Sequence, residues 1–167
     1  MLISSGSATA RVDLYLVIKT VHIVSATVLF GTGLGIAALF FSSNLSSDTA
    51  ARRFAAAMTV RADFIFTLPA VILQPLSGLW LVSRAGFSWT DYWLVWTYAL
   101  YALAGICWIP VVLIQIRMKQ MLDRQAGGEA IDQAAYNRLF RWWFALGWPA
   151  FGGLIAVFFL MVAKPSW

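Results

Sequence analysis

The stretch VHIVSATVLFGTGLGIAALFF, residues 21–41, contains no charged residue. At a rise of ~1.5 Å per residue, a helix of this length crosses the ~30 Å hydrocarbon core of a bilayer. A segment in that core must be helical, because no water is available to satisfy a strand edge or a loop. The stretch therefore predicts a first transmembrane helix, which we extend to residues 14–42.

Three further apolar stretches follow the first one along the chain. Each is uncharged and again long enough to cross the core: residues 64–82, 92–116 and 142–163. With their edges, the four spans cover residues 14–42, 62–84, 91–117 and 141–163. The predicted fold class is all-α, a four-helix transmembrane bundle of up-down-up-down order. We expect one integral membrane domain over residues 1–167.

The overall composition supports this assignment. The chain of 167 residues is 61% hydrophobic and 11% charged, whereas a soluble domain carries about 25% charged residues. So few charges cannot cover a water-exposed surface, so the apolar excess must face lipid. The single cysteine, Cys107, excludes an intrachain disulfide and a cysteine-based metal cluster.

The connectors contain helix caps and breakers. Ser47 or Asp48 is placed to cap a helix that runs directly into the second span. Gly86 lies in the short second connector and predicts a tight turn there. The pair Gly127-Gly128 should end the third helix beyond the membrane surface.

The net charge of +5 is interpreted as a topology signal and not as nucleic-acid binding, because the basic residues flank the spans. Eight lie in or beside the long connectors: Arg52, Arg53, Arg61, Arg117, Lys119, Arg124, Arg138 and Arg141. Four lie on the opposite side: Arg11, Lys19, Arg84 and Lys164. This excess predicts cytoplasmic long connectors and both termini outside.

Tryptophans are expected to form aromatic belts at both surfaces. The predicted outer belt contains Trp80, Trp89, Trp93, Trp96 and Trp167, and the predicted inner belt contains Trp142 and Trp143.

The only histidine, His22, lies about two turns inside the first span and shares a helix face with Lys19. Ionisable residues in a membrane usually face the bundle interior or a water-filled cavity. A neutral imidazole is a ligand for haem iron or another metal, or a proton relay. The alternative is a histidine hydrogen-bonded to a neighbouring helix, with Lys19 reaching the outer surface.

Counting inward from the outer helix ends suggests neighbours for His22. Gln74, Tyr98 and Tyr101 fall near its depth, with small glycines at Gly152 and Gly153 opposite. Together with Lys19 they form the predicted cofactor-binding pocket. The alternative is that the tyrosines point to the interface and the glycines permit close helix packing.

The other three predicted helices each contain a helix-breaking proline at a similar depth in the membrane. Pro69, Pro110 and Pro149 each lie about two turns from the inner helix end, level with the run of glycines at residues 31–35. A proline removes a backbone hydrogen bond and can bend its helix, so we expect kinked helices. Ordinary close packing is the alternative explanation of this layer.

A polar group lies near the inner surface. Arg61 and Asp63 are too close in sequence to share a helix face, so Asp63 is predicted to pair with Arg117 or Arg141 across helices. Such a pair is most often a structural clasp, and a substrate gate is the alternative.

Several catalytic motifs are absent from the sequence. There is no Ser/His/Asp set, Walker loop, GxGxxG motif or CxxC motif. This argues against hydrolysis and nucleotide-driven transport. One histidine also excludes bis-histidine haem ligation within a single chain, so a homodimer, a membrane partner protein or a non-histidine ligand would be needed.

The run VIKTVHIVSATVLFGTGLG, residues 17–35, resembles the opening of small four-helix bacterial membrane proteins that include the CopD-like and HemJ-like proteins. Nearly the whole chain is similar to an uncharacterised branch, a family of unknown function. The segments that match are RADF (61–64), QPLSGLWL (74–81), IPVVLIQIRMK (109–119), LGWPAF (146–151) and LMVAKP (160–165). The resemblance implies a bacterial inner membrane, in which the outer termini predicted from the basic residues are periplasmic.

In HemJ-like proteins a first-helix histidine binds haem b, and a lysine on a later helix is important. The resemblance therefore implies His22 as a haem or metal ligand. The third helix reads WLVWTYALY here and has no such lysine. Its absence argues against the oxidase activity of HemJ-like enzymes.

Three functions remain as hypotheses. The first is a haem- or quinone-associated redox component that uses His22. The second is a small-molecule or metal-ion permease, and the third is a non-catalytic accessory or assembly protein.

Overall fold

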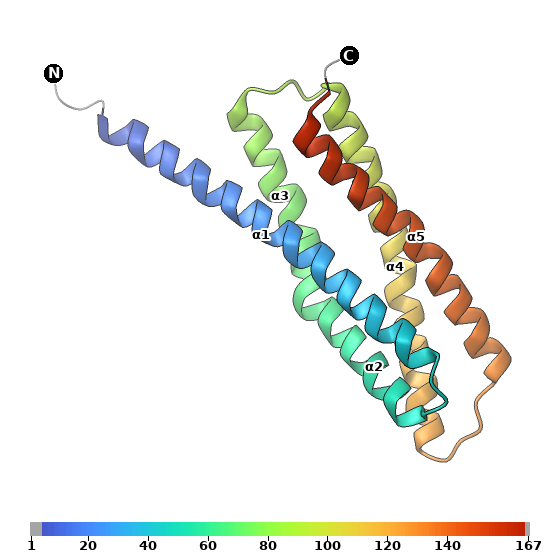
Figure 1. Cartoon of the computed structure of the whole chain (residues 1–167). Helices are drawn as coiled ribbons and strands as arrows, with labels where there is room; N and C mark the ends of the chain where they lie inside the picture. Colours follow the sequence, from blue (N-terminus) through green and yellow to red (C-terminus); the bar gives the residue numbers. More distant parts are fainter. Residues whose placement is uncertain (1–4, 166–167) are drawn as a thin grey trace.

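The computed structural model describes the backbone of residues 5–165 and the side chains of residues 14–165. The elements in chain order are α1 (Ser5–Asn44), α2 (Thr49–Ala62), the π-helical η1 (Asp63–Thr67), α3 (Leu68–Ala85), α4 (Tyr92–Ala126) and α5 (Gln133–Ala163). α2, η1 and α3 follow one another without a break, so the chain forms four helical rods that alternate in direction (Figure 1). The predicted all-α four-helix bundle is confirmed.

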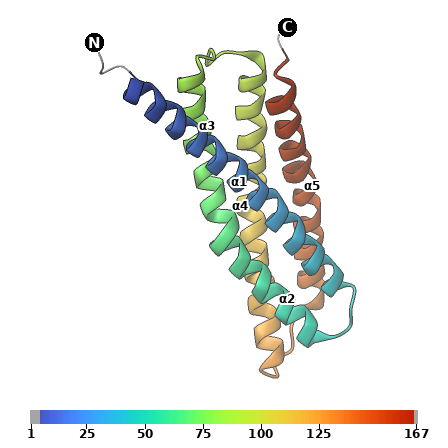
Figure 2. The same ribbon diagram turned by 60° about the vertical axis from the view of Figure 1, so that its left-hand side comes forward.

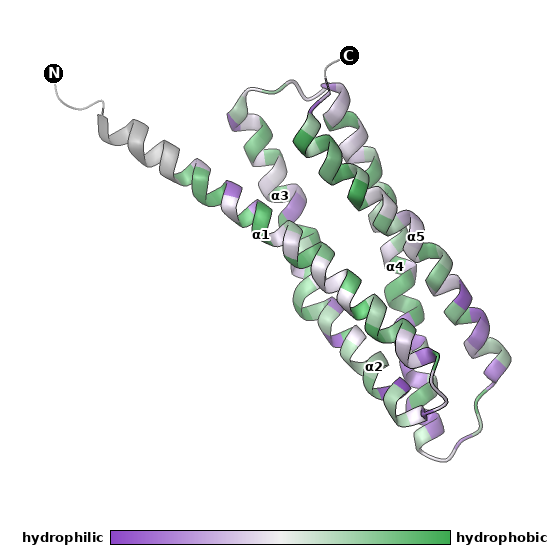
Figure 3. Cartoon of the chain, viewed as in Figure 1, coloured by the Kyte–Doolittle hydropathy of each residue, from purple (hydrophilic) through white to green (hydrophobic). Residues whose placement is uncertain are grey.

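All four rods are long and apolar enough to cross a membrane: Leu14–Asn44, Thr49–Ala85, Tyr92–Ala126 and Gln133–Ala163. Hydrophobic residues cover most of their length, and hydrophilic residues gather near the end that carries the α1–α2 and α4–α5 connectors (Figure 3). We call this end the connector end. Three of the rods extend well past the predicted spans on this side, so their polar ends can project from the bilayer.

The helix boundaries follow from local capping chemistry. Asp48 caps α2, because its side chain accepts a hydrogen bond of 2.8 Å from the Ala50 backbone nitrogen. Asp132 caps α5 in the same way, through the Ala135 nitrogen at 3.0 Å. Gly86 ends α3 with a φ of 75°, a left-handed conformation that favours glycine. The cap at Asp48 and the turn at Gly86 confirm the predictions.

The rods are not packed evenly. α4 and α5 lie side by side along their length, whereas α1 packs on α2 and α3 (Figure 2). α2 also packs on α4, which joins the two pairs at the connector end. The N-terminal part of α1 runs away from the other helices in both views (Figures 1 and 2).

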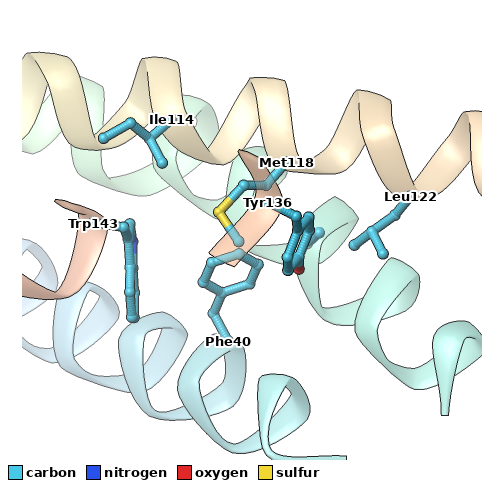
Figure 4. Packing of buried hydrophobic residues seen from close by; sticks show 7 residues of the cluster. Phe40, Ile114, Met118, Leu122, Tyr136 and Trp143 are labelled. Atoms are coloured by element: carbon cyan, nitrogen blue, oxygen red, sulfur yellow. The ribbon is translucent and has the colours of Figure 1, made fainter. Parts of the chain in front are cut away.

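A hydrophobic core joins the rods at the connector end. Its fully or nearly fully buried residues are Phe40, Ala56, Ile114, Met118, Leu122, Tyr136 and Trp143. Phe40 points between Trp143 and Tyr136 (Figure 4). The Tyr136 hydroxyl donates a hydrogen bond of 2.7 Å to Asn44 Oδ1, so α5 is also tied to the last turn of α1.

The aromatic belts are corrected in part. Trp93 and Trp143 are each only 6% exposed, so neither faces the membrane surface. Each instead packs into a core cluster, where a large ring gains dispersion contacts from the neighbouring helices. Trp89, Trp96 and Trp142 are exposed, as a belt requires. Trp167 lies outside the described residues, and so does the Arg11 side chain.

The second rod contains the π-helical turn, which ends at Thr67, two residues before Pro69. Pro69 has no N–H, so it cannot donate to the carbonyl one α-helical turn earlier. The residue before it, Leu68, donates its N–H to the Asp63 carbonyl, five residues back, which is the π-helical register. Pro75, Pro110 and Pro149 lie inside α3, α4 and α5.

Candidate functional site

His22 lies where α1 crosses α3. Its Nδ1 is 2.8 Å from Ser77 Oγ. Ser77 Oγ is also 2.5 Å from the Leu73 carbonyl oxygen, and two oxygens at this distance require a hydrogen between them. With the single hydroxyl hydrogen of Ser77 pointing to Leu73, the consistent assignment makes His22 Nδ1 the donor to Ser77. In this tautomer Nε2 carries the lone pair.

Gln74 completes this polar contact between the helices. Its Nε2 donates to the His22 carbonyl oxygen at 2.7 Å and to Ser25 Oγ at 2.6 Å. His22 and Ser25 are three residues apart on α1, and Gln74 and Ser77 are three apart on α3, so each pair shares a helix face. We call these four residues the α1–α3 polar contact.

Gly78 lets the two helices approach at this point. A Cβ at Gly78 would lie 3.2 Å from His22 Cε1, closer than an ordinary van der Waals contact. The His22 ring thus packs directly against the α3 backbone. His22 lines neither the large cavity among the four rods nor the smaller one between α1 and the second rod.

The structure brings together only part of the predicted pocket. His22 and Gln74 are in contact. Lys19 is exposed, and Tyr98 is 37% exposed. The Tyr101 hydroxyl donates to the Val71 carbonyl oxygen at 2.7 Å and does not reach His22.

A central cavity of about 470 Å³ lies among all four rods. Its walls are mostly apolar and aromatic, and they include Leu29, Phe30, Leu34, Phe41, Val71, Val111, Phe144, Trp148, Phe151, Leu154 and Ile155. Gly33, Gly105 and Gly147 also line it and leave room because they have no side chain. This volume is within the range of small-molecule sites.

The cavity opens sideways. Its exposed lining residues come from two helices only, namely Leu34 and Ala38 of α1 and Phe144, Trp148 and Ile155 of α5. The mouth therefore lies between α1 and α5. Because these helices are candidate membrane spans, the mouth faces lipid.

A cluster of four hydrogen-bonded side chains lines the cavity toward the connector end. Trp108 Nε1 donates to Asp63 Oδ1 at 3.3 Å. In the amide orientation that satisfies both of its ends, Gln115 donates to Asp63 Oδ2 at 2.6 Å and accepts from Trp143 Nε1 at 3.1 Å. Asp63 is only 3% exposed. We call Asp63, Trp108, Gln115 and Trp143 the Asp63 network.

The predicted ion pair of Asp63 with Arg117 or Arg141 is wrong. Asp63 forms no salt bridge with a basic residue in the described part of the chain, and its partners are the neutral groups named above. The cross-helix ion pair instead joins Arg53 and Asp123 at 2.7 Å, and Lys119 lies 2.6 Å from the same carboxylate.

Thr67 adds a second polar group to the cavity wall. It is 3% exposed, and its hydroxyl lies near the Asp63 carboxylate without forming a hydrogen bond of standard geometry. Asp63 and Thr67 are the first and last residues of the π-helical turn, and both line the cavity. π-helical turns occur frequently at functional sites.

The Asp63 network was not predicted as a ligand site. Asp63 directly precedes an uncharged span that contains a proline, and this was the one signal in the sequence that could have drawn attention to it. As for metals, no group of three or more His, Cys, Asp and Glu residues is placed to hold an ion within the described ranges.

Comparison with known proteins gives one match. The family described as "Predicted integral membrane protein (DUF2269)" matches residues 16–165. No curated protein and no solved structure matches the chain, so these comparisons do not connect it to the CopD-like or HemJ-like proteins. Because the match covers nearly the whole chain, this protein belongs to the DUF2269 family of predicted integral membrane proteins.

Proposed function

We propose that this membrane protein binds a small lipid-soluble molecule in its central cavity. The observation that carries the proposal is a cavity of about 470 Å³ whose exposed lining residues all belong to α1 and α5. An apolar site with a few convergent polar groups is the usual form of a small-molecule site. Both a permease and a quinone-associated protein need such a binding step.

A cavity-filling variant tests this proposal. Gly105 lines the cavity, and a Cβ built on it meets no atom within 4 Å, so Gly105→Leu places its side chain in open space. We expect wild-type protein in lipid nanodiscs to bind decylubiquinone saturably. Trp108, Trp143 and Trp148 line the cavity, so quenching of tryptophan fluorescence reports binding. Gly105→Leu should weaken binding at least tenfold.

Gly35→Leu is the matched control. Gly35 also has open space around its Cβ position but does not line the cavity. Its binding curve should superimpose on that of the wild type. Equal binding by Gly105→Leu and the wild type would contradict the proposal.

We propose haem ligation by His22 as a second candidate function. The observation that favours it is the contact of His22 Nδ1 with Ser77 Oγ, which itself donates to the Leu73 carbonyl oxygen: if Nδ1 is the donor to Ser77, Nε2 is left with a lone pair. Ligating histidines usually donate their other ring N–H in this way. Haem b would supply electron-transfer chemistry when bound. His22 is the only histidine, so a second histidine ligand would come from another copy or a membrane partner.

An absorption spectrum tests this second candidate. Protein purified gently from cells supplied with haem is expected to show a Soret band, and His22→Ala should lose it. Tyr101→Phe is the control, because its hydroxyl bonds to a backbone carbonyl on α3 and not to His22. A colourless wild-type protein, or a band that persists in His22→Ala, would count against haem ligation.

We also infer that the connector end lies in the bacterial cytoplasm and both termini lie in the periplasm. The charge asymmetry supports this orientation, with eight basic residues on the connector side and four on the other.

A further inference from the structure

We propose that the natural ligand of the central cavity is a lipophilic cation, such as an amine or onium compound with an aromatic or aliphatic body. This inference rests on the proposed function, because it names the class of molecule that the same cavity binds. It is carried by three features of the cavity: an unpaired carboxylate, aromatic walls and a mouth that faces lipid.

Asp63 is the only acidic residue, and there is no basic residue, among the described residues that line the cavity. A carboxylate removed from water is costly unless a cation or a proton accompanies it. The donors that it has, Trp108 and Gln115, are neutral. A carboxylate accepts about four hydrogen bonds, so capacity remains for a ligand. An anionic ligand would meet only repulsion here.

The aromatic walls suit a cation as well. The rings that line the cavity belong to Phe30, Phe41, Tyr101, Trp108, Trp143, Phe144, Trp148 and Phe151. A cation over an aromatic face is attracted by the ring quadrupole, and desolvation strengthens this attraction. Quaternary ammonium groups are recognised in proteins by aromatic cages of this kind.

Thr67 places a second polar side chain beside Asp63 on the cavity wall. Its buried hydroxyl lies near the Asp63 carboxylate but forms no hydrogen bond of standard geometry, so it can still bond to a ligand. It lies one π-helical turn from Asp63 on the same cavity wall. A protonated amine that donates to Asp63 can donate a second hydrogen bond to Thr67, whereas an entirely apolar ligand would use neither group.

A neutral ligand with only acceptor groups would require the opposite protonation state of Asp63. Such a molecule needs a protonated Asp63 as a hydrogen-bond donor, and an asparagine amide at this position would serve it equally well. A cation needs the negative charge. The substitution Asp63→Asn therefore separates the two chemistries.

The experiment measures tetraphenylphosphonium binding by equilibrium dialysis with nanodiscs of phosphatidylcholine, which carries no net charge. We expect saturable binding by the wild type and at least a tenfold loss in Asp63→Asn. Decylubiquinone binding should change less than twofold in the same variant. Asp123→Asn removes a carboxylate outside the cavity and should bind both probes as the wild type does.

A second pair of variants keeps the test decisive if Asp63→Asn does not fold. Thr67→Lys supplies a tethered cation beside Asp63, and Thr67→Met adds a neutral side chain of similar length. Thr67→Lys should abolish tetraphenylphosphonium binding, whereas Thr67→Met should weaken both probes equally. Equal effects of Lys and Met on tetraphenylphosphonium would overturn the inference.

The remaining outcomes separate the two proposals. If the wild type binds decylubiquinone but not tetraphenylphosphonium, or if Asp63→Asn retains tetraphenylphosphonium binding, the cation inference is wrong and the cavity function stands. If the wild type binds neither probe, both are wrong.

Discussion

Phe40→Ala is expected to lower the free energy of unfolding by about 2–3 kcal/mol, measured by titration of the reconstituted protein with SDS. Phe40 is 0% exposed and lies at the centre of the core at the connector end (Figure 4). Its ring centroid is 5.0 Å from that of Trp143, in an edge-to-face arrangement. Alanine would leave a void that the surrounding helices fill only partly.

The expected loss is smaller than the ~3–5 kcal/mol typical of Phe→Ala in a soluble core. Lipid is as apolar as a protein interior, so transfer of the ring contributes little, and lost packing contacts account for most of the effect. Phe159→Ala is the control, because Phe159 is 68% exposed on α5 and its ring already contacts lipid. Its unfolding free energy should change by less than ~0.5 kcal/mol. Equal losses of unfolding free energy in the two variants would show that the hydrophobic core at the connector end does not stabilise the bundle.

Gly78→Leu is expected to separate α1 from α3 and to destabilise the protein by about 2 kcal/mol or more. Even a Cβ at this position would lie 3.2 Å from His22 Cε1. The longer side chain must displace His22, and the hydrogen bonds of Ser77 and Gln74 to His22 are then lost. Each interhelical hydrogen bond contributes about 0.6 kcal/mol in a membrane protein.

Gly31→Leu provides the matched comparison for Gly78→Leu. Gly31 also lies within a membrane helix, but nothing approaches its Cβ position within 4 Å. We expect no loss of stability there, because leucine has the higher helix propensity. A cross-link between cysteines placed on α1 and α3 reports separation directly. If Gly78→Leu keeps wild-type stability and cross-linking, the close approach of His22 to α3 is not structurally important.

Much of the fold could be predicted because it depends on local chemistry. A span is recognised by the absence of charge over some twenty residues, and this needs no knowledge of the neighbouring helices. The cap at Asp48 and the turn at Gly86 are local as well, since each satisfies backbone groups or allows a φ that its own position requires. The exact ends of the helices beyond the membrane were harder to predict. A helix continues with the same backbone geometry when its residues change from apolar to polar, so the loss of hydrophobicity does not mark where it ends.

The candidate site was harder to predict, because depth along a helix does not specify the direction of a side chain. Gln74 and Tyr101 were both placed near the depth of His22, yet Gln74 contacts His22 and Tyr101 bonds to Val71. The direction depends on rotation about the helix axis, which advances ~100° per residue. The π-helical turn at Asp63–Thr67 shifts this rotation by one additional residue, and no periodicity in the sequence marks it.

Charge depletion and capping residues alone are therefore enough to specify four membrane helices and several of their ends. Only the packed structure decides what the polar residues within them do. It turns His22 toward Ser77 and Gln74, and it directs Asp63 to Trp108 and Gln115 instead of an arginine. It also leaves a lipid-facing cavity between α1 and α5. The physical reason is that spans arise from solvation of each segment by lipid, whereas a binding site arises from the relative rotation and spacing of several segments.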